Sequence, residues 1–114
     1  MSFIEEFEQY VLPTYKRYPL VFVKGRGMKI WDENGDEYLD FFPGWGVGNL
    51  GHCHPDVVRA VKEQVENLIH VPNIYYSYPQ GQLAKLLSEN SFGGQVFFCN
   101  SGAEANEGAI KLAR

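Results

Sequence analysis

Apolar residues recur at helical spacing in two well separated segments of the chain. The first segment follows Ser2 and Glu5, whose types and spacing form a capping box, and it ends at Pro13. The second segment begins at Pro55, a residue that is tolerated in the first turn of a helix, and runs to Ile69. In the second segment the valines and leucine fall on one face and the charged residues on the others. The pattern predicts a short amphipathic helix and then a longer one whose apolar face packs in a core.

Between these two helices the hydrophobic pattern changes to a period of two. It covers residues 20–40 and is interrupted by a turn at residues 25–27 and by the pair Asn34-Gly35, a strong hairpin signal. The segment therefore predicts a small antiparallel meander. The acidic residues 32–36 are like a calcium loop only superficially, because Pro43 stands where such a loop has its closing glutamate.

The stretch from Gln95 to Arg114 predicts a strand, a tight turn and a helix. Residues 96–99 are an apolar run of strand length, and Ser101 and Glu104 form a second capping box in which each residue bonds the backbone N–H of the other. Gly102 allows a ligand to approach the backbone, and a helix N-terminus favours a phosphate. From the residues alone two interpretations stay open: a phosphate site, or a capped helix that binds nothing.

Two loops have unusual compositions. Residues 41–54 hold four of the chain's twelve glycines, and such a loop either lines a ligand or is a close-packed crossover. Residues 71–78 are crowded with aromatic side chains, which are typical of interfaces. A further helix is predicted to begin at Pro79 and to end at residues 90–94.

Composition excludes several classes of function. With 45% hydrophobic and 15% aromatic residues, the chain is predicted to be globular. Ten basic and fourteen acidic residues give a net charge of −4 without a basic stripe, so neither nucleic acid nor an anionic membrane is favoured as a partner. No apolar run approaches the length of a membrane span. The acidic N-terminus is unlike a targeting peptide, and we expect a cytoplasmic location.

The cysteines and histidines were considered as metal ligands. His52, Cys53 and His54 are of the right types, but their spacing is poor and no further cluster completes four ligands. We therefore expect no metal site. Cys53 and Cys99 are far apart in sequence, and two free thiols are expected.

The segment FFCNSGAEANEGAIKLAR resembles the phosphate-binding segment of class III aminotransferases, which are pyridoxal-phosphate (PLP) enzymes of fold type I. Upstream, DENGDEYLDF, GNLGHCHPDVVRAVKEQ and HVPNIYYSYPQGQLAKLL resemble the same family in the same order, most closely its acetylornithine branch. The resemblance covers nearly the whole chain from about Tyr15 onward.

The resemblance implies an α/β fold, the N-terminal part of a fold type I PLP-dependent transferase, with a small antiparallel meander and then the start of the αβ large domain. Residues 1–54 would belong to the small domain and residues 55–114 to the PLP-binding large domain. By the same resemblance, three consecutive residues bind the cofactor phosphate, the last two through backbone N–H groups, and two aromatic residues bind the substrate. They are Ser101, Gly102 and Ala103 for the phosphate, and Trp45 and Tyr76 for the substrate.

The resemblance also implies a reaction. The parent protein would transfer the terminal amine of N-acetylornithine to 2-oxoglutarate, giving N-acetylglutamate semialdehyde and glutamate in arginine biosynthesis, as a homodimer. The alternatives are another class III enzyme, such as an ornithine or 4-aminobutyrate aminotransferase or an aminomutase, or a catalytically inactive fragment. The last helix has no stop signal before Arg114, and family members are several times longer. We therefore expect an N-terminal piece of a larger enzyme that lacks the catalytic lysine, a role that Lys111 does not fill.

Overall fold

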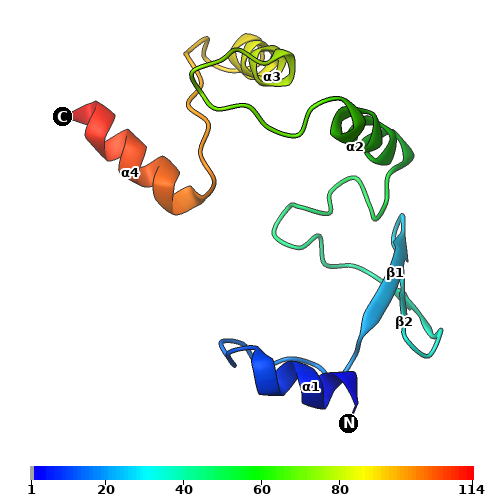
Figure 1. Ribbon diagram of the computed structural model, residues 1–114. Helices are drawn as coiled ribbons and strands as arrows, with labels where there is room; N and C mark the ends of the chain where they lie inside the picture. The colour runs from blue at the N-terminus through cyan, green and yellow to red at the C-terminus, as the bar shows by residue number, and fades with distance from the viewer. Residues whose placement is uncertain (1) are drawn as a thin grey trace. The chain divides into compact units, whose positions relative to one another are not determined.

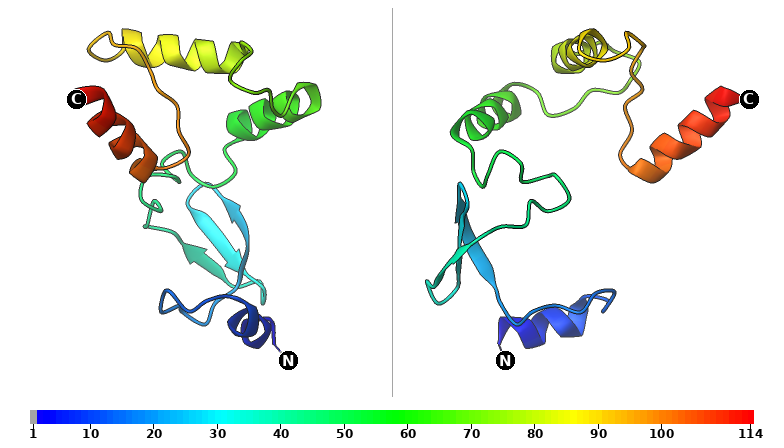
Figure 2. Two further views of the ribbon diagram at one scale, coloured as in Figure 1. Left: turned by 60° about the vertical axis from the view of Figure 1, so that its left-hand side comes forward. Right: turned by 180° about the vertical axis from the view of Figure 1, so that it is seen from behind.

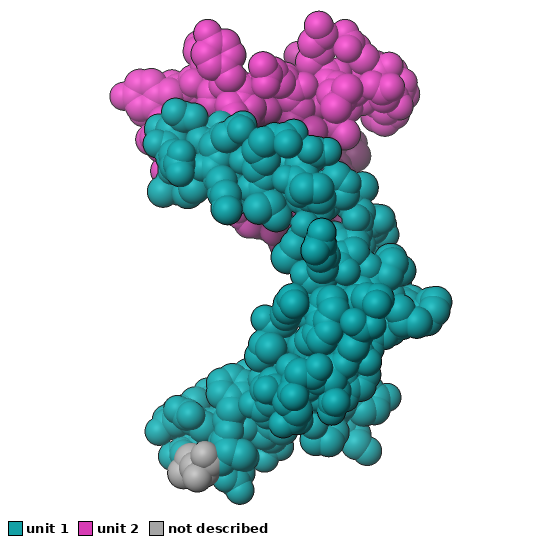
Figure 3. Space-filling model, turned by 90° about the vertical axis from the view of Figure 1, so that its right-hand side faces the viewer, with its two compact units in different colours: residues 1–69 teal, residues 70–114 magenta. Residues whose placement is uncertain are grey.

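The computed structural model describes residues 2–114, and the helices and strands found there are shown in Figure 1. The chain divides after Ile69 into two units, coloured separately in Figure 3, and each unit is described by itself. In chain order the elements are α1 (Phe3–Tyr10), β1 (Phe22–Arg26), β2 (Lys29–Asp32), β3 (Glu37–Leu39), α2 (Pro55–Asn67), α3 (Tyr78–Glu89) and α4 (Gly102–Ala113). The predicted domain boundary after residue 54 concerns the whole protein and stays a prediction.

The helices of the first unit begin as the sequence predicts. The Ser2 hydroxyl accepts a hydrogen bond from the Glu5 N–H at 3.3 Å, and the Glu5 carboxylate accepts one from the Ser2 N–H at 2.7 Å, so the capping box of α1 is confirmed. His54 caps α2, its Nδ1 accepting from the Asp56 N–H at 3.3 Å, and Pro55 takes the first helical position. The helix ends at Asn67, two residues before the predicted end at Ile69.

The predicted meander is present as one antiparallel sheet of order β1-β2-β3, seen from two sides in Figure 2. In β1 and β2, Gly25 pairs with Ile30 and Arg26 with Lys29. The predicted first turn at residues 25–27 is therefore wrong, since the first two of its residues belong to the ladder. The chain reverses instead at Gly27 and Met28, where Gly27 takes a φ of +59°.

Asp32 organises the second turn of the meander, and it is the one buried polar side chain of the described residues, at 3% exposure. Its Oδ1 accepts from the N–H groups of Asn34 at 3.0 Å and Asp36 at 2.9 Å, and its Oδ2 accepts from the Tyr38 hydroxyl at 3.1 Å. Burial by itself raises the pKa of Asp32, but these hydrogen bonds together outweigh burial and leave the pKa below its ordinary value. The same bond to Asp32 raises the pKa of Tyr38.

A hydrophobic core is missing from the described residues, none of whose apolar side chains is buried. Within each unit of the described residues, the paired strands are the elements that contact one another, and no helix packs against another element of its own unit. The prediction that the apolar face of α2 packs in a core is therefore wrong for this chain, and Val61 is 61% exposed. The face has the spacing of a buried stripe but no neighbouring element to bury it. None of the helices in residues 2–114 is both long enough and apolar enough to span a membrane.

We expect the Asp32 carboxyl to titrate with a midpoint below 3.8, its ordinary pKa. Because the folded-state pKa is the lower one, the ionised carboxylate stabilises the turn above the unfolded-state pKa. This contribution is lost as the pH falls through the folded-state pKa. An NMR titration of the carboxyl, with the Asn34 and Asp36 amide shifts followed in parallel, measures this midpoint.

The matched control is Glu33→Gln, which removes an exposed carboxylate of the same turn and should leave the Asp32 titration unchanged. A midpoint at or above 3.8 would contradict the inferred hydrogen-bond network.

Candidate phosphate-binding site

The apolar run before the last helix lies outside the sheet. The structure assigns no strand to residues 96–99, so that prediction is wrong for the described chain. A strand needs a neighbour for its backbone N–H and C=O groups, and the described residues offer none beside this run. The run still lies along α4, because a Cβ added at Gly108 would come within 3.1 Å of the Phe97 ring. Glycine at this position lets the ring approach the helix.

The N-terminus of α4 is capped by Ser101. The Ser101 backbone is extended, with φ −153° and ψ 160°, and its Oγ accepts from the Glu104 N–H at 3.2 Å. This half of the predicted capping box is confirmed. The other half is wrong, because Glu104 Oε2 accepts from the Asn100 N–H at 2.7 Å instead of from the Ser101 N–H. The carboxylate reaches one residue further back than a capping box requires, and it closes the turn from Asn100 onward.

Three N–H groups at this helix end have no partner within the described residues, namely those of Ser101, Gly102 and Ala103. The first four N–H groups of an α-helix lack an acceptor in the helix itself. In α4, the Glu104 N–H bonds the Ser101 hydroxyl and the Ala105 N–H bonds the Ser101 carbonyl at 3.0 Å. The N–H groups of Gly102 and Ala103 therefore remain for a ligand, at the positive end of the helix dipole. A Cβ added at Gly102 would meet no atom within 4 Å outside its chain neighbours and the helix backbone, so there is open space beside this residue.

The Ser101 hydroxyl can donate only one hydrogen bond. Its oxygen lies 3.3 Å from Glu104 Oε2, and a hydroxyl has a single proton to donate. Donation to Glu104 and donation to a bound phosphate exclude each other. Ser101 can therefore bind a phosphate only by turning its proton away from Glu104, whereas the Gly102 and Ala103 N–H groups are ready without rearrangement.

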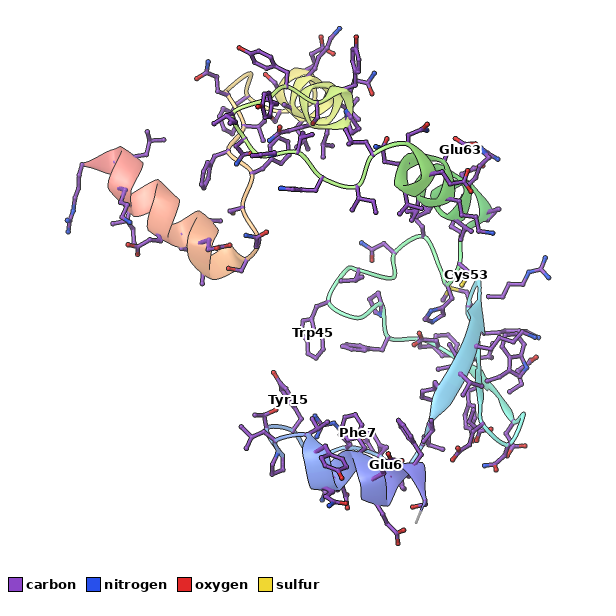
Figure 4. All side chains as sticks on the ribbon, in the orientation of Figure 1. Glu6, Phe7, Tyr15, Trp45, Cys53 and Glu63 are labelled. Atoms are coloured by element: carbon purple, nitrogen blue, oxygen red, sulfur yellow. The ribbon has the colours of Figure 1, made fainter. Side chains whose placement is uncertain are left out.

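Trp45 stands on the glycine-rich loop of the first unit, from which its side chain projects in Figure 4. Its ring is 90% exposed and packs edge-on against Phe42, with the ring centroids 4.9 Å apart. Its φ of 53° lies in the left-handed region, which costs a residue with a side chain roughly 1–2 kcal/mol. Residues held in such backbone conformations cluster at functional sites, which favours a functional role for Trp45.

Tyr76 lies in the loop before α3, and its side chain is fully exposed. It borders a shallow depression with Ser77, Gln82 and Lys85. Tyr76 and the N-terminus of α4 belong to the second unit, whereas Trp45 belongs to the first. Each predicted residue is therefore described within its own unit.

Both histidines beside Cys53 have hydrogen-bond partners among the described residues. His52 contacts Asp40, with Nε2 2.6 Å from Oδ2, and His54 caps α2. No group of three or more potential ligands gathers anywhere in residues 2–114. Sequence reasoning did not single out Asp40, because its partner lies twelve residues away and no spacing rule links an aspartate to a histidine at that distance.

Comparison with known proteins identifies the family to which the chain belongs. The model of the aminotransferase class III family matches residues 10–114. The acetylornithine aminotransferase of Caldanaerobacter subterraneus subsp. tengcongensis is 59% identical over 107 residues, which are 94% of this chain and 27% of that protein. The acetylornithine aminotransferase of Methanocaldococcus jannaschii is 57% identical over 113 residues, covering 99% of this chain and 28% of that protein. The chain belongs to the class III aminotransferase family.

Solved structures agree with this assignment. The acetylornithine aminotransferase from Elizabethkingia anophelis matches with a TM-score of 0.90 and 35% identity, over 97% of this chain and 29% of that one. The ornithine aminotransferase from Toxoplasma gondii, in a structure with partial occupancy of PLP at its active site, matches with a TM-score of 0.89 and 37% identity, over 97% of this chain and 26% of that one. The chain therefore has the fold of the matching part of an aminotransferase, and it spans about a quarter of the length of its relatives.

Proposed function

We propose that the whole protein is an aminotransferase that uses PLP, and that the N-terminus of α4 holds the phosphate of this cofactor. The observation that carries the proposal is the pair of N–H groups of Gly102 and Ala103, which lie unpaired at the positive end of a capped helix. Membership of the class III family supports it, as does the PLP in the active site of the Toxoplasma gondii enzyme.

The chain's own part in the reaction is to bind and orient the cofactor. When bound, PLP would supply an aldehyde that can accept an amino group and a ring that can withdraw electrons during proton removal. Gly102 and Ala103 donate two backbone hydrogen bonds to the phosphate, and Ser101 adds a third once its proton leaves Glu104. Glu104 holds the Asn100 N–H and so keeps the turn closed while the phosphate is bound.

The lysine that carries the cofactor in this family is proposed to lie outside residues 2–114. Lys111 is on the same helix as the phosphate site, but nine residues beyond Gly102, which is about 13 Å along the axis at the rise of an α-helix. Its amino group is 3.2 Å from a Glu107 carboxylate oxygen on the exposed surface of the helix. This exposed ion pair favours a structural role for Lys111 on the surface of the helix.

The proposed amino donor is N-acetylornithine and the proposed acceptor is 2-oxoglutarate, as a step of arginine biosynthesis. The acetylornithine aminotransferases among the relatives and the solved structures support this donor. Ornithine is the second candidate, supported by the Toxoplasma gondii enzyme. Trp45 and Tyr76, both exposed aromatic residues, are proposed to contact the substrate. A homodimer in the cytoplasm belongs to the same proposal and follows from the family alone.

A panel of amino donors tests the reaction. With 2-oxoglutarate as acceptor, we expect the purified protein to form glutamate from N-acetylornithine with a kcat/KM about tenfold or more above that for ornithine. The reason is that acetylation removes the charge of the α-amino group, and a site built for the neutral amide has no partner for a second ammonium. Preference for ornithine would favour the second candidate, and no glutamate from any terminal-amine donor would refute the proposed function.

The Gly102→Pro variant tests the phosphate site. Proline removes one N–H but suits the first position of a helix, and the extended backbone of Ser101 suits the residue before a proline. Loss of a hydrogen bond to a charged group should raise the Kd for PLP about tenfold to a hundredfold. The affinity can be followed by the visible absorbance of the cofactor.

The matched control is Gly102→Ala, which adds a methyl group but keeps the N–H, and whose Cβ meets no protein atom within 4 Å. We expect it to weaken PLP binding less than Gly102→Pro does. Wild-type affinity in the proline variant would show that the phosphate does not use this N–H.

A further inference from the structure

Both ends of the loop that carries Trp45 are held at the same turn. Asp40 donates its N–H to the carbonyl of Met28 at 2.8 Å. His52 exchanges two backbone hydrogen bonds with Gly27, with distances of 2.8 and 2.9 Å. Gly27 and Met28 form the turn between β1 and β2. Residues 41–51 therefore leave the sheet and return to it at one place.

Asp40 and His52, which we call the loop clasp, also bond each other through their side chains. His52 Nε2 lies 2.6 Å from Asp40 Oδ2, and because an ionised carboxylate only accepts, the imidazole is the donor. The imidazole fits over Gly25, where an added Cβ would lie 2.7 Å from His52 Cβ and Cγ. Two hydrogen bonds lower the pKa of Asp40. The bond from His52 has the larger effect and the bond from the Phe42 N–H the smaller, and the carboxylate is ionised at neutral pH.

A short series of contacts leads from the loop clasp to Trp45. Asp40 Oδ1 accepts from the Phe42 N–H at 2.9 Å, and Trp45 packs edge-on against the Phe42 ring. Within the loop, the Gly48 N–H donates to the carbonyl of Pro43 at 2.8 Å. Trp45 and Gly46 are the central residues of a turn in which the Val47 N–H donates to the Gly44 carbonyl at 3.2 Å, and this turn holds the left-handed backbone of Trp45. Phe42 connects the turn to Asp40 through its N–H and its ring.

We propose that Asp40 and His52 are positioning residues, which close the loop of residues 41–51 and thereby hold the turn that contains Trp45 toward the substrate. The proposal rests on the proposed function, in which Trp45 contacts the amino donor. In this proposal, Asp40 and His52 act on the reaction only through Phe42 and Trp45.

The Asp40→Asn variant of the full protein tests the loop clasp. Asparagine keeps the size of the side chain but loses the charge that strengthens the bond with His52. Amide hydrogen exchange of peptides covering residues 41–51, read by mass spectrometry, should become about tenfold faster. The KM for the amino donor should rise about tenfold, with a smaller change in kcat. Asp56→Asn, which breaks an exposed ion pair with Arg59, is the matched control and should change neither quantity.

Two further variants separate positioning from general stability. His52→Gln can still donate a hydrogen bond, so it should restore part of what His52→Ala loses. In a Trp45→Ala background, Asp40→Asn should still speed the exchange of the loop but should no longer raise KM, because its effect passes through Trp45.

Each negative result would overturn a different part of the proposal. Unchanged exchange in Asp40→Asn would overturn the loop clasp. Faster exchange with an unchanged KM, or a KM effect that persists without Trp45, would overturn the positioning role and leave the proposed function standing. A wild-type protein without transaminase activity would refute the proposed function, and the link to the substrate with it, whatever the exchange of the loop.

Discussion

Hydrogen bonds between side chains and nearby backbone N–H groups are the interactions on which the described structure depends. Asp32 closes the second turn of the meander, Ser2 starts α1, and Ser101 starts α4, each bonding an N–H no more than four residues away. Burial contributes little, since no apolar side chain is buried within residues 2–114. The candidate phosphate site is a consequence of the same chemistry, because capping satisfies the Glu104 N–H and leaves those of Gly102 and Ala103 free.

Short-range bonds of this kind can be predicted from sequence, and longer-range contacts cannot. The spacing of Ser2 and Glu5 predicts a complete capping box, which is present, whereas the same spacing at Ser101 and Glu104 gives only the half in which serine accepts. Residues 96–99 were predicted as a strand from composition, but a strand also needs a neighbour, which its own residues do not specify. The contact of Asp40 with His52 depends on how the glycine-rich loop returns to the sheet, and no local pattern encodes that path. The family resemblance supplied the remaining site residues, including Trp45 and Tyr76.

The helix end that is proposed to bind a phosphate already has a carboxylate beside it. Glu104 is repelled by a second anion, yet its bond to the Asn100 N–H keeps the turn in the shape that exposes the next two N–H groups. The two effects oppose each other, and the balance depends on where the proton of Ser101 points. If the proton of Ser101 turns toward the proposed phosphate, Ser101 gains a charged acceptor while Glu104 can keep its bond to the Asn100 N–H.

The central claim is that the N–H groups of Gly102 and Ala103 bind the cofactor phosphate. The most direct test is a crystal structure of the whole protein loaded with PLP. We predict phosphate oxygens within about 3.2 Å of both nitrogen atoms and within hydrogen-bond distance of Ser101 Oγ. A phosphate bound elsewhere, with both N–H groups facing solvent, would contradict this prediction.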